Sequence, residues 1–151
     1  MIFGKILSDE QQKALVWDIG RGVPGTALPR AWQTDTCIGG WHYDRSLYDR
    51  NGYKSAKAVA HMLADIVSKN GNLFLNVPVR ADGSIDEKEE GVLEGIAAWM
   101  GVNQEAIFGT RPRAVFGEGP ASDGAPEFHR AGLPARRHRH ARRMPAADRE
   151  G

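Results

Sequence analysis

The chain has 151 residues and a formal net charge of +1, with 41% hydrophobic and 26% charged residues, values typical of one globular domain. No run approaches the ~18 consecutive apolar residues of a membrane span, and the first residues lack the apolar core of a secretory signal peptide. The single cysteine, Cys37, excludes a disulfide framework and a cysteine-based metal site.

The N-terminal part of the chain predicts one short helix and two strands. Ser8 and Gln11 have the spacing of a capping box, which opens a helix. Two apolar runs of strand length follow, and the three glycines and two prolines between them predict a loop. The predicted elements are, in order, a helix at 8–14, a strand at 15–19, a loop at 20–29 and a strand at 32–38.

The middle of the chain predicts two helices around a strand. Ser55 can cap the first helix, whose apolar side chains recur at helical spacing, and Asn70-Gly71 is a typical helix end. Asp86 and Glu89 form a second capping box. The predicted elements are a helix at 55–69, a strand at 72–77, a turn at 81–83, a helix at 86–101 and a short strand at 105–109. We expect the second helix to bury Val92, Leu93, Ile96, Ala97 and Trp99 or Met100.

The order of these elements favours an α/β fold with parallel strands. Four strands are enough for half of an eight-stranded barrel or for a small open sheet. A whole (β/α)₈ barrel takes about 250 residues, so the chain is too short to form one.

The residues most suited to chemistry lie in the run 32–43 (WQTDTCIGGWHY). Its aromatic rings alternate with Gln, Asp and His side chains, a mixture that suits a sugar, since a sugar offers an apolar face and several hydroxyls. The structural alternative is that Trp32 and Trp41 anchor the core and that Asp35 caps a turn. The residue types leave both interpretations open.

Four segments, in order, resemble glycoside hydrolase family 29, the α-L-fucosidases. They are LVWDIGRG, WQTDTCIGGWHYDR, ADIVSKNGNLFLNVPVRADGSID and NQEAIFGTRPRAVFGEGP, which together cover about residues 5–120. The resemblance implies the C-terminal half of a (β/α)₈ barrel, from a retaining exo-glycosidase that removes terminal α-L-fucose from glycoconjugates. It implies neither a cofactor nor a metal.

The resemblance also implies site residues. The family's nucleophile is an aspartate on an earlier strand, so none is assigned in this chain and the chain alone is expected to be inactive. Two branches of the family place the acid/base glutamate where this chain has Gln33 or Gly20, which leaves Asp35 as the fallback candidate. The residues expected to contact fucose are Arg21, Trp32, Gln33, Trp41 and His42.

The composition changes near residue 119. Residues 121–151 hold seven arginines, four acidic residues and no lysine, with too little apolar surface to offset the entropy of ordering a chain. We therefore expect a partial catalytic barrel at 1–118 and a disordered tail at 119–151, of the kind that a shifted reading frame in GC-rich DNA produces. We expect a fucosylated glycan as partner and neither nucleic acid nor membrane. The alternatives are a fucose-binding remnant without activity and a basic module that binds nucleic acid through residues 129–143.

Overall fold

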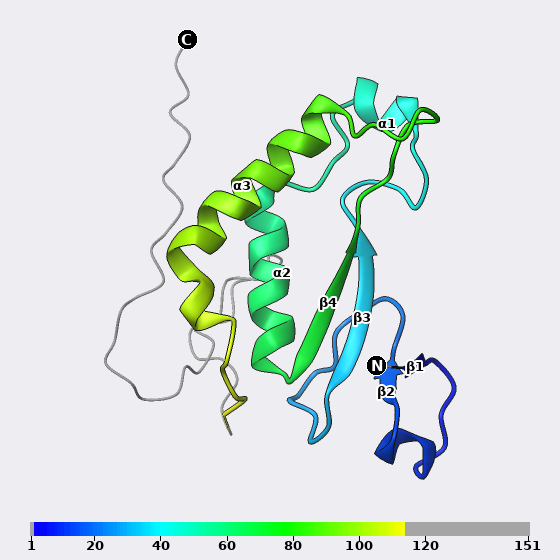
Figure 1. Ribbon diagram of the computed structural model, residues 1–151, viewed down its shortest axis with the longest axis vertical. Coiled ribbons are helices and arrows are strands. Elements are labelled where there is room, and N and C mark those ends of the chain that lie inside the picture. Colours follow the sequence, from blue (N-terminus) through cyan, green and yellow to red (C-terminus); the bar gives the residue numbers. More distant parts are fainter. Residues whose placement is uncertain (1, 114–151) are drawn as a thin grey trace.

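The computed structural model describes residues 2–113 as an α/β fold built on a parallel sheet (Figure 1). The sheet has four strands in the order β1-β2-β3-β4, and every neighbouring pair is parallel. The alternation of strands and helices in the sequence predicts this arrangement, which is confirmed. The strands are β1 (Phe3–Gly4), β2 (Val16–Asp18), β3 (Trp32–Cys37) and β4 (Gly71–Asn76).

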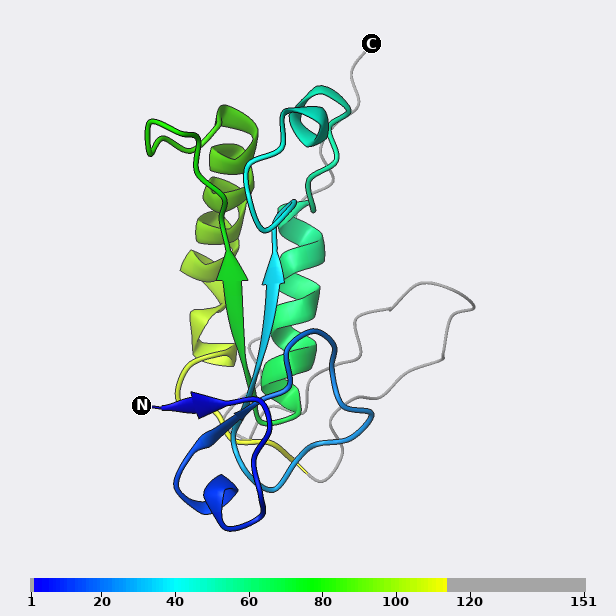
Figure 2. The same ribbon diagram turned by 90° about the vertical axis from the view of Figure 1, so that its right-hand side faces the viewer.

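The helices lie on one face of the sheet, as the two views in Figures 1 and 2 show. The two long helices pack on each other, and α2 packs on β4. A short helix stands beyond the carboxyl ends of the same strands. The α-helices are α1 (Arg45–Asp49), α2 (Ala56–Ser68) and α3 (Glu87–Asn103), and the 3-10 helices are η1 (Gln11–Lys13) and η2 (Gln104–Ala106).

The helix starts follow from local capping chemistry. The Ser8 amide donates to the Gln11 side chain at 2.9 Å and the Gln11 amide donates to the Ser8 hydroxyl at 3.4 Å, so the predicted capping box forms. The Ser55 hydroxyl accepts from the amide of Ala58 at the start of α2. At the other end of α2, Asn70 takes a left-handed conformation with φ +70° and reverses the chain into β4.

The contact of Trp32 with Gly71 sets the register of β3 and β4. These residues are Cα partners at the start of the two strands, and a Cβ added to Gly71 would lie 2.4 Å from the Trp32 ring. The indole N–H donates to the carbonyl oxygen of Lys69 at 2.8 Å, and the side chain is 1% exposed. Only glycine at position 71 leaves room for the ring beneath α2.

Three expectations at the ends of the chain are wrong. Residues 105–109 form no strand, because the amides of Ile107 and Phe108 bond back to Gln104 in a 3-10 turn. Helix α3 continues past Gly101 to Asn103, since nothing at Gly101 turns the backbone. Ala97 is exposed rather than buried, and the other side chains that we expect this helix to bury are only half-buried: Val92, Leu93, Ile96, Trp99 and Met100. The expectations for residues 119–151 lie outside the residues that the structure describes.

Two elements are absent from the sequence prediction. Strand β1 has two residues, too few to show a period, and exists because Phe3 and Gly4 pair with Val16 and Trp17 of β2. Helix α1 has five residues and begins at the Asp44 carboxylate, which accepts from the amide of Ser46 at 2.8 Å. Both elements depend on single contacts rather than on a repeated pattern.

The face of the sheet opposite the helices exposes apolar side chains, and we predict that the chain self-associates through it. Within residues 2–113 no element covers this face, where Phe3 is 42% and Phe74 is 58% exposed, and β1 and β4 have free edges. Parallel sheets are normally buried on both faces, and free edges template association. Sedimentation velocity should show soluble aggregates, and Phe74→Lys should increase the monomer fraction.

A matched control is Phe108→Lys, since Phe108 is 67% exposed but lies outside the sheet. It should leave the aggregates unchanged. A monodisperse wild-type monomer that melts cooperatively would contradict this prediction.

Candidate functional site

An exposed aromatic ring and a guanidinium meet where β2 and β3 end. Arg21 follows β2 and Trp41 follows β3, and the Arg21 guanidinium carbon lies 4.9 Å from the centre of the Trp41 ring. Trp41 is 43% exposed, so a ligand can contact its ring. The Arg21 guanidinium lies over the ring and interacts with it as a cation–π pair. Functional side chains of α/β barrels and open parallel sheets gather at this carboxyl edge.

Residues 38–41 form the Trp41 segment, and hydrogen bonds hold its backbone from both sides. The Asn76 amide, at the end of β4, donates to the carbonyl oxygens of Gly40 at 3.3 Å and Trp41 at 3.2 Å. On the other side, the Lys54 backbone amide donates to Ile38 O at 2.9 Å. Asn76 therefore satisfies backbone groups of this segment.

Tyr53 supports the same segment from below. A Cβ added to Gly39 would lie 2.8 Å from the Tyr53 ring, so the ring packs directly on the glycine backbone. The Tyr53 hydroxyl donates to the Asp86 carboxylate at 2.6 Å. Burial and the Asp86 carboxylate raise the pKa of Tyr53 well above its usual value, which keeps the hydroxyl a donor at all ordinary pH values.

The loop before Arg21 is shaped by short polar contacts. The Asp18 carboxylate accepts from the Gly20 amide at 2.8 Å, so Asp18 caps the loop. Gly20 has φ +70°, a conformation that favours glycine. The Thr34 hydroxyl lies 2.7 Å from Gly20 O and 2.8 Å from Gly22 O. These contacts bring Arg21 back toward β3.

A small cavity of about 180 Å³ lies beside Arg21, between β3, the loop after β2 and α2. Among the described residues that line it, Asp35 is the only carboxylate. Its side chain is 16% exposed and its Oδ2 lies 3.5 Å from the ammonium nitrogen of Lys5. Lys5 and Asp35 thus form an ion pair beside the cavity.

The other predicted site residues are divided between the two ends of the sheet. His42 is exposed directly after Trp41, and Gln33 lies in β3 on the same face as Asp35. Trp32 lies at the amino end of β3, buried against Gly71, because its indole closes the turn between α2 and β4. The structure therefore does not bring Trp32 together with Arg21 and Trp41, and its expected contact with fucose is replaced by a packing role.

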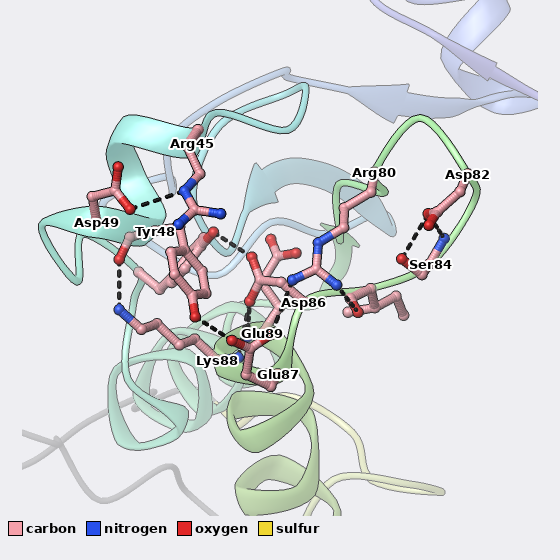
Figure 3. Close-up of polar contacts among 12 residues, drawn as sticks. Arg45, Tyr48, Asp49, Arg80, Asp82, Ser84, Asp86, Glu87, Lys88 and Glu89 are labelled. Carbon is pink, nitrogen blue, oxygen red and sulfur yellow. Dashed lines mark hydrogen bonds and ion pairs between the residues drawn. The ribbon is translucent and has the colours of Figure 1, made fainter.

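The sequence predictions miss a polar cluster at the first turn of α3 (Figure 3). The Glu87 carboxylate accepts from the Tyr48 hydroxyl and from Arg80. The Tyr48 hydrogen bond and then the Arg80 guanidinium help to lower the pKa of Glu87 to about 2. The carboxylate therefore stays ionised at the N-terminus of the helix, where negative charge is favourable.

Glu89 in the same cluster has an unusual environment. Its side chain is 0% exposed, and neither carboxylate oxygen has a hydrogen-bond partner among the described residues. Burial, followed by the charge of Asp86, raises the pKa of Glu89 to about 7. Asp86 accepts from the amides of Lys88 and Glu89, but Glu89 does not reach back, so only half of the predicted capping box forms.

Within the described range, no group of three or more His, Cys, Asp and Glu side chains could hold a metal ion. No helix in that range is long and apolar enough to cross a membrane.

The fold and the site together define an α/β protein with a parallel sheet and an aromatic-cation pair at the carboxyl ends of its strands. A sequence model of one family, described as alpha-L-fucosidase, matches residues 4–105. The chain belongs to the alpha-L-fucosidase family. The match confirms the resemblance over the first three of the four sequence segments, which lie within these residues.

Individual relatives agree with this membership. The chain is similar to the plasma alpha-L-fucosidase of Homo sapiens, with 33% identity over 89 residues, which are 58% of this chain and 19% of that protein. The structure of alpha-L-fucosidase isoenzyme 1 from Paenibacillus thiaminolyticus superposes with a TM-score of 0.59 and 30% identity, over 66% of this chain and 25% of that one.

A Thermotoga maritima alpha-fucosidase solved in complex with fucose gives a TM-score of 0.54 and 30% identity, over 62% of this chain and 21% of that one. The chain thus spans about a fifth of the length of the curated relatives that it matches.

The contact of Gly39 with Tyr53 gives a prediction about stability. Gly39→Ala should lower the free energy of unfolding by about 1–3 kcal/mol, because the added Cβ overlaps the ring. Urea unfolding followed by circular dichroism measures this change. Gly91→Ala is the control: a Cβ at Gly91, inside α3, meets nothing within 4 Å, so the variant should gain up to about 1 kcal/mol. Equal stability of Gly39→Ala and wild type would exclude the contact.

Proposed function

We propose that the chain supplies the fucose-binding wall of a retaining α-L-fucosidase and that residues 2–113 correspond to the C-terminal half of its (β/α)₈ barrel. The substrate is the terminal α-L-fucose of a glycoconjugate. The observation that supports this most strongly is the Arg21–Trp41 pair at the carboxyl ends of β2 and β3, in a chain that belongs to this family.

The proposed contacts follow from the chemistry of the sugar. Trp41 presents an exposed ring to the apolar face and the methyl group of fucose. Arg21, beside that ring, donates hydrogen bonds to sugar hydroxyls and adds positive charge where the nucleophile reacts. His42 and Gln33 are the further proposed polar contacts. Trp32 is left out, because its side chain is buried against Gly71.

The proposed chemistry needs a second polypeptide segment. A retaining glycosidase uses two carboxyl groups about 5–5.5 Å apart, a nucleophile and an acid/base. In the described part of the chain, Asp35 is the single carboxylate in the cavity lining. An amide such as Gln33 cannot exchange a proton at neutral pH. We therefore assign no catalytic residue, keep Asp35 as the candidate acid/base and expect the chain alone to be inactive.

Fucose binding tests the proposal. Binding of L-fucose to the full chain should be detectable by ligand-observed NMR. Trp41→Ala should weaken this binding at least about tenfold, because the face of the ring is lost. Arg21→Ala should also weaken it. Arg30→Ala is the matched control, because Arg30 is exposed and donates to the Asp9 carbonyl in a loop at the amino end of β3. Equal affinity of the Trp41 and Arg30 variants would contradict the proposed site.

Catalysis is expected to be absent. The purified chain should not release aryl leaving groups from an aryl α-L-fucoside above background, because loss of a covalent nucleophile costs many orders of magnitude in rate. A chromogenic assay at several pH values checks this. Turnover that Asp35→Asn abolishes would show that the chain holds its own carboxyl pair.

The same assays distinguish the proposed function from two alternative functions. A fucose-binding remnant without any catalytic partner would bind fucose but gain no activity when the rest of a family barrel is added. A basic module would bind nucleic acid through residues 129–143, which lie outside the described residues, and would lose that binding when those arginines are replaced. Fucose binding that survives removal of residues 121–151 favours the proposed function over the basic module.

A further inference from the structure

The buried Glu89 side chain lies close to the support of the Trp41 segment. It sits at the first turn of α3, where the charges of Asp86 at the same helix end and of Arg80 after β4 act on it (Figure 3). The charge of Glu89 acts in turn on Tyr53, ahead of α2. Its two carboxylate oxygens have no partner within the described range. A fully buried and unpartnered carboxylate is costly when ionised and tolerable when protonated.

A continuous series of contacts connects the first turn of α3 with the exposed ring of Trp41. Asp86, next to Glu89, accepts from the Tyr53 hydroxyl at 2.6 Å. The Tyr53 ring packs on Gly39, and Gly39-Gly40 leads directly into Trp41. Arg21 then stacks on Trp41 at 4.9 Å. Every step joins atoms in direct contact, so a displacement of Asp86 or Tyr53 reaches the aromatic ring.

We propose that Tyr53 and Glu89 are positioning residues for the sugar-facing Trp41 segment: neutral Glu89 keeps the Asp86–Tyr53 support closed, and ionised Glu89 opens it and weakens fucose binding. The inference rests on the proposed function for its ligand. The physical reason is that ionised Glu89 adds a second carboxylate charge beside Asp86, in a place shielded from water. Water that enters between α3 and Tyr53 lowers the energetic cost of this charge. The Tyr53 ring then leaves Gly39.

The direction of the pH effect follows from linkage. Burial raises the pKa of Glu89 from 4.5 to about 7, so the folded chain holds this proton more tightly than the unfolded chain. The stabilisation by the proton is fully present below the unfolded pKa and is lost as the pH rises through about 7. The Trp41 segment is accordingly closed on the acid side.

The test uses the full chain with 5-fluorotryptophan in a His42→Gln background, which removes the imidazole that follows Trp41. The ¹⁹F resonance of Trp41, assigned with Trp41→Phe, should shift with a midpoint near pH 7, while those of Trp17, Trp32 and Trp99 stay constant. Glu89→Gln and Tyr53→Phe should each abolish the Trp41 titration. Glu90→Gln, an exposed neighbour, is the control and should retain it.

Fucose affinity gives the second measurement, with His42 present. The dissociation constant of L-fucose should rise about fivefold between pH 6 and pH 8 in wild type and stay constant in Glu89→Gln. A Trp41 shift that persists in Glu89→Gln, a shift of all four resonances together or no shift in the His42→Gln background would overturn the inference. A normal Trp41 titration without fucose binding at any pH would instead overturn the proposed function and leave the positioning role intact.

Discussion

The packing of Trp32 over Gly71 is the contact on which the described fold depends most. It sets β3 and β4 in register, and its indole hydrogen bond to Lys69 O ties the end of α2 to the start of β3. Six consecutive Cα pairs follow from this starting point. Because parallel strands in register end together, Trp41 and Asn76 then meet at the carboxyl edge, where Asn76 holds the Trp41 backbone.

The exposed Trp41 ring at that edge is positioned mainly by hydrogen bonds to the backbone of its segment. The Trp41 segment contains two glycines and has little side-chain volume of its own, so its position must come from neighbours. Lys54 and Asn76 hold its carbonyl groups, and Tyr53 fills the space under Gly39. The Tyr53 hydroxyl in turn donates to the Asp86 carboxylate, which caps α3. The cap of α3 and the exposed Trp41 ring are therefore connected through Tyr53.

This arrangement explains why an interior carboxylate can influence a surface site. A hydrogen-bonded network in a low-dielectric environment responds strongly to one added charge. Glu89 has no hydrogen-bond partner among the described residues, whereas the nearby Glu87 is paired with Tyr48 and Arg80. Two glutamates two positions apart therefore have pKa values shifted in opposite directions, chiefly by the Tyr48 hydrogen bond in one case and by burial in the other.

The sequence by itself determined the order of the main elements, the parallel α/β class and the family. Apolar periodicity, the capping residues Ser8, Ser55 and Asp86, and the chain reversal at Asn70 are local properties, and local properties can be derived from neighbouring residues. The motif segments likewise depend only on the order of residues, and the match to residues 4–105 confirms the three segments that lie within it.

The tertiary structure alone decided which of the interleaved aromatic and polar residues face a ligand. The resemblance implies that both Trp32 and Trp41 contact fucose, yet Trp32 is 1% and Trp41 is 43% exposed, because the α2–β4 turn closes over Trp32. The same holds for Glu89 and for the two-residue strand β1. Burial and pairing arise from residues distant in the chain, so no pattern in a short window reports them.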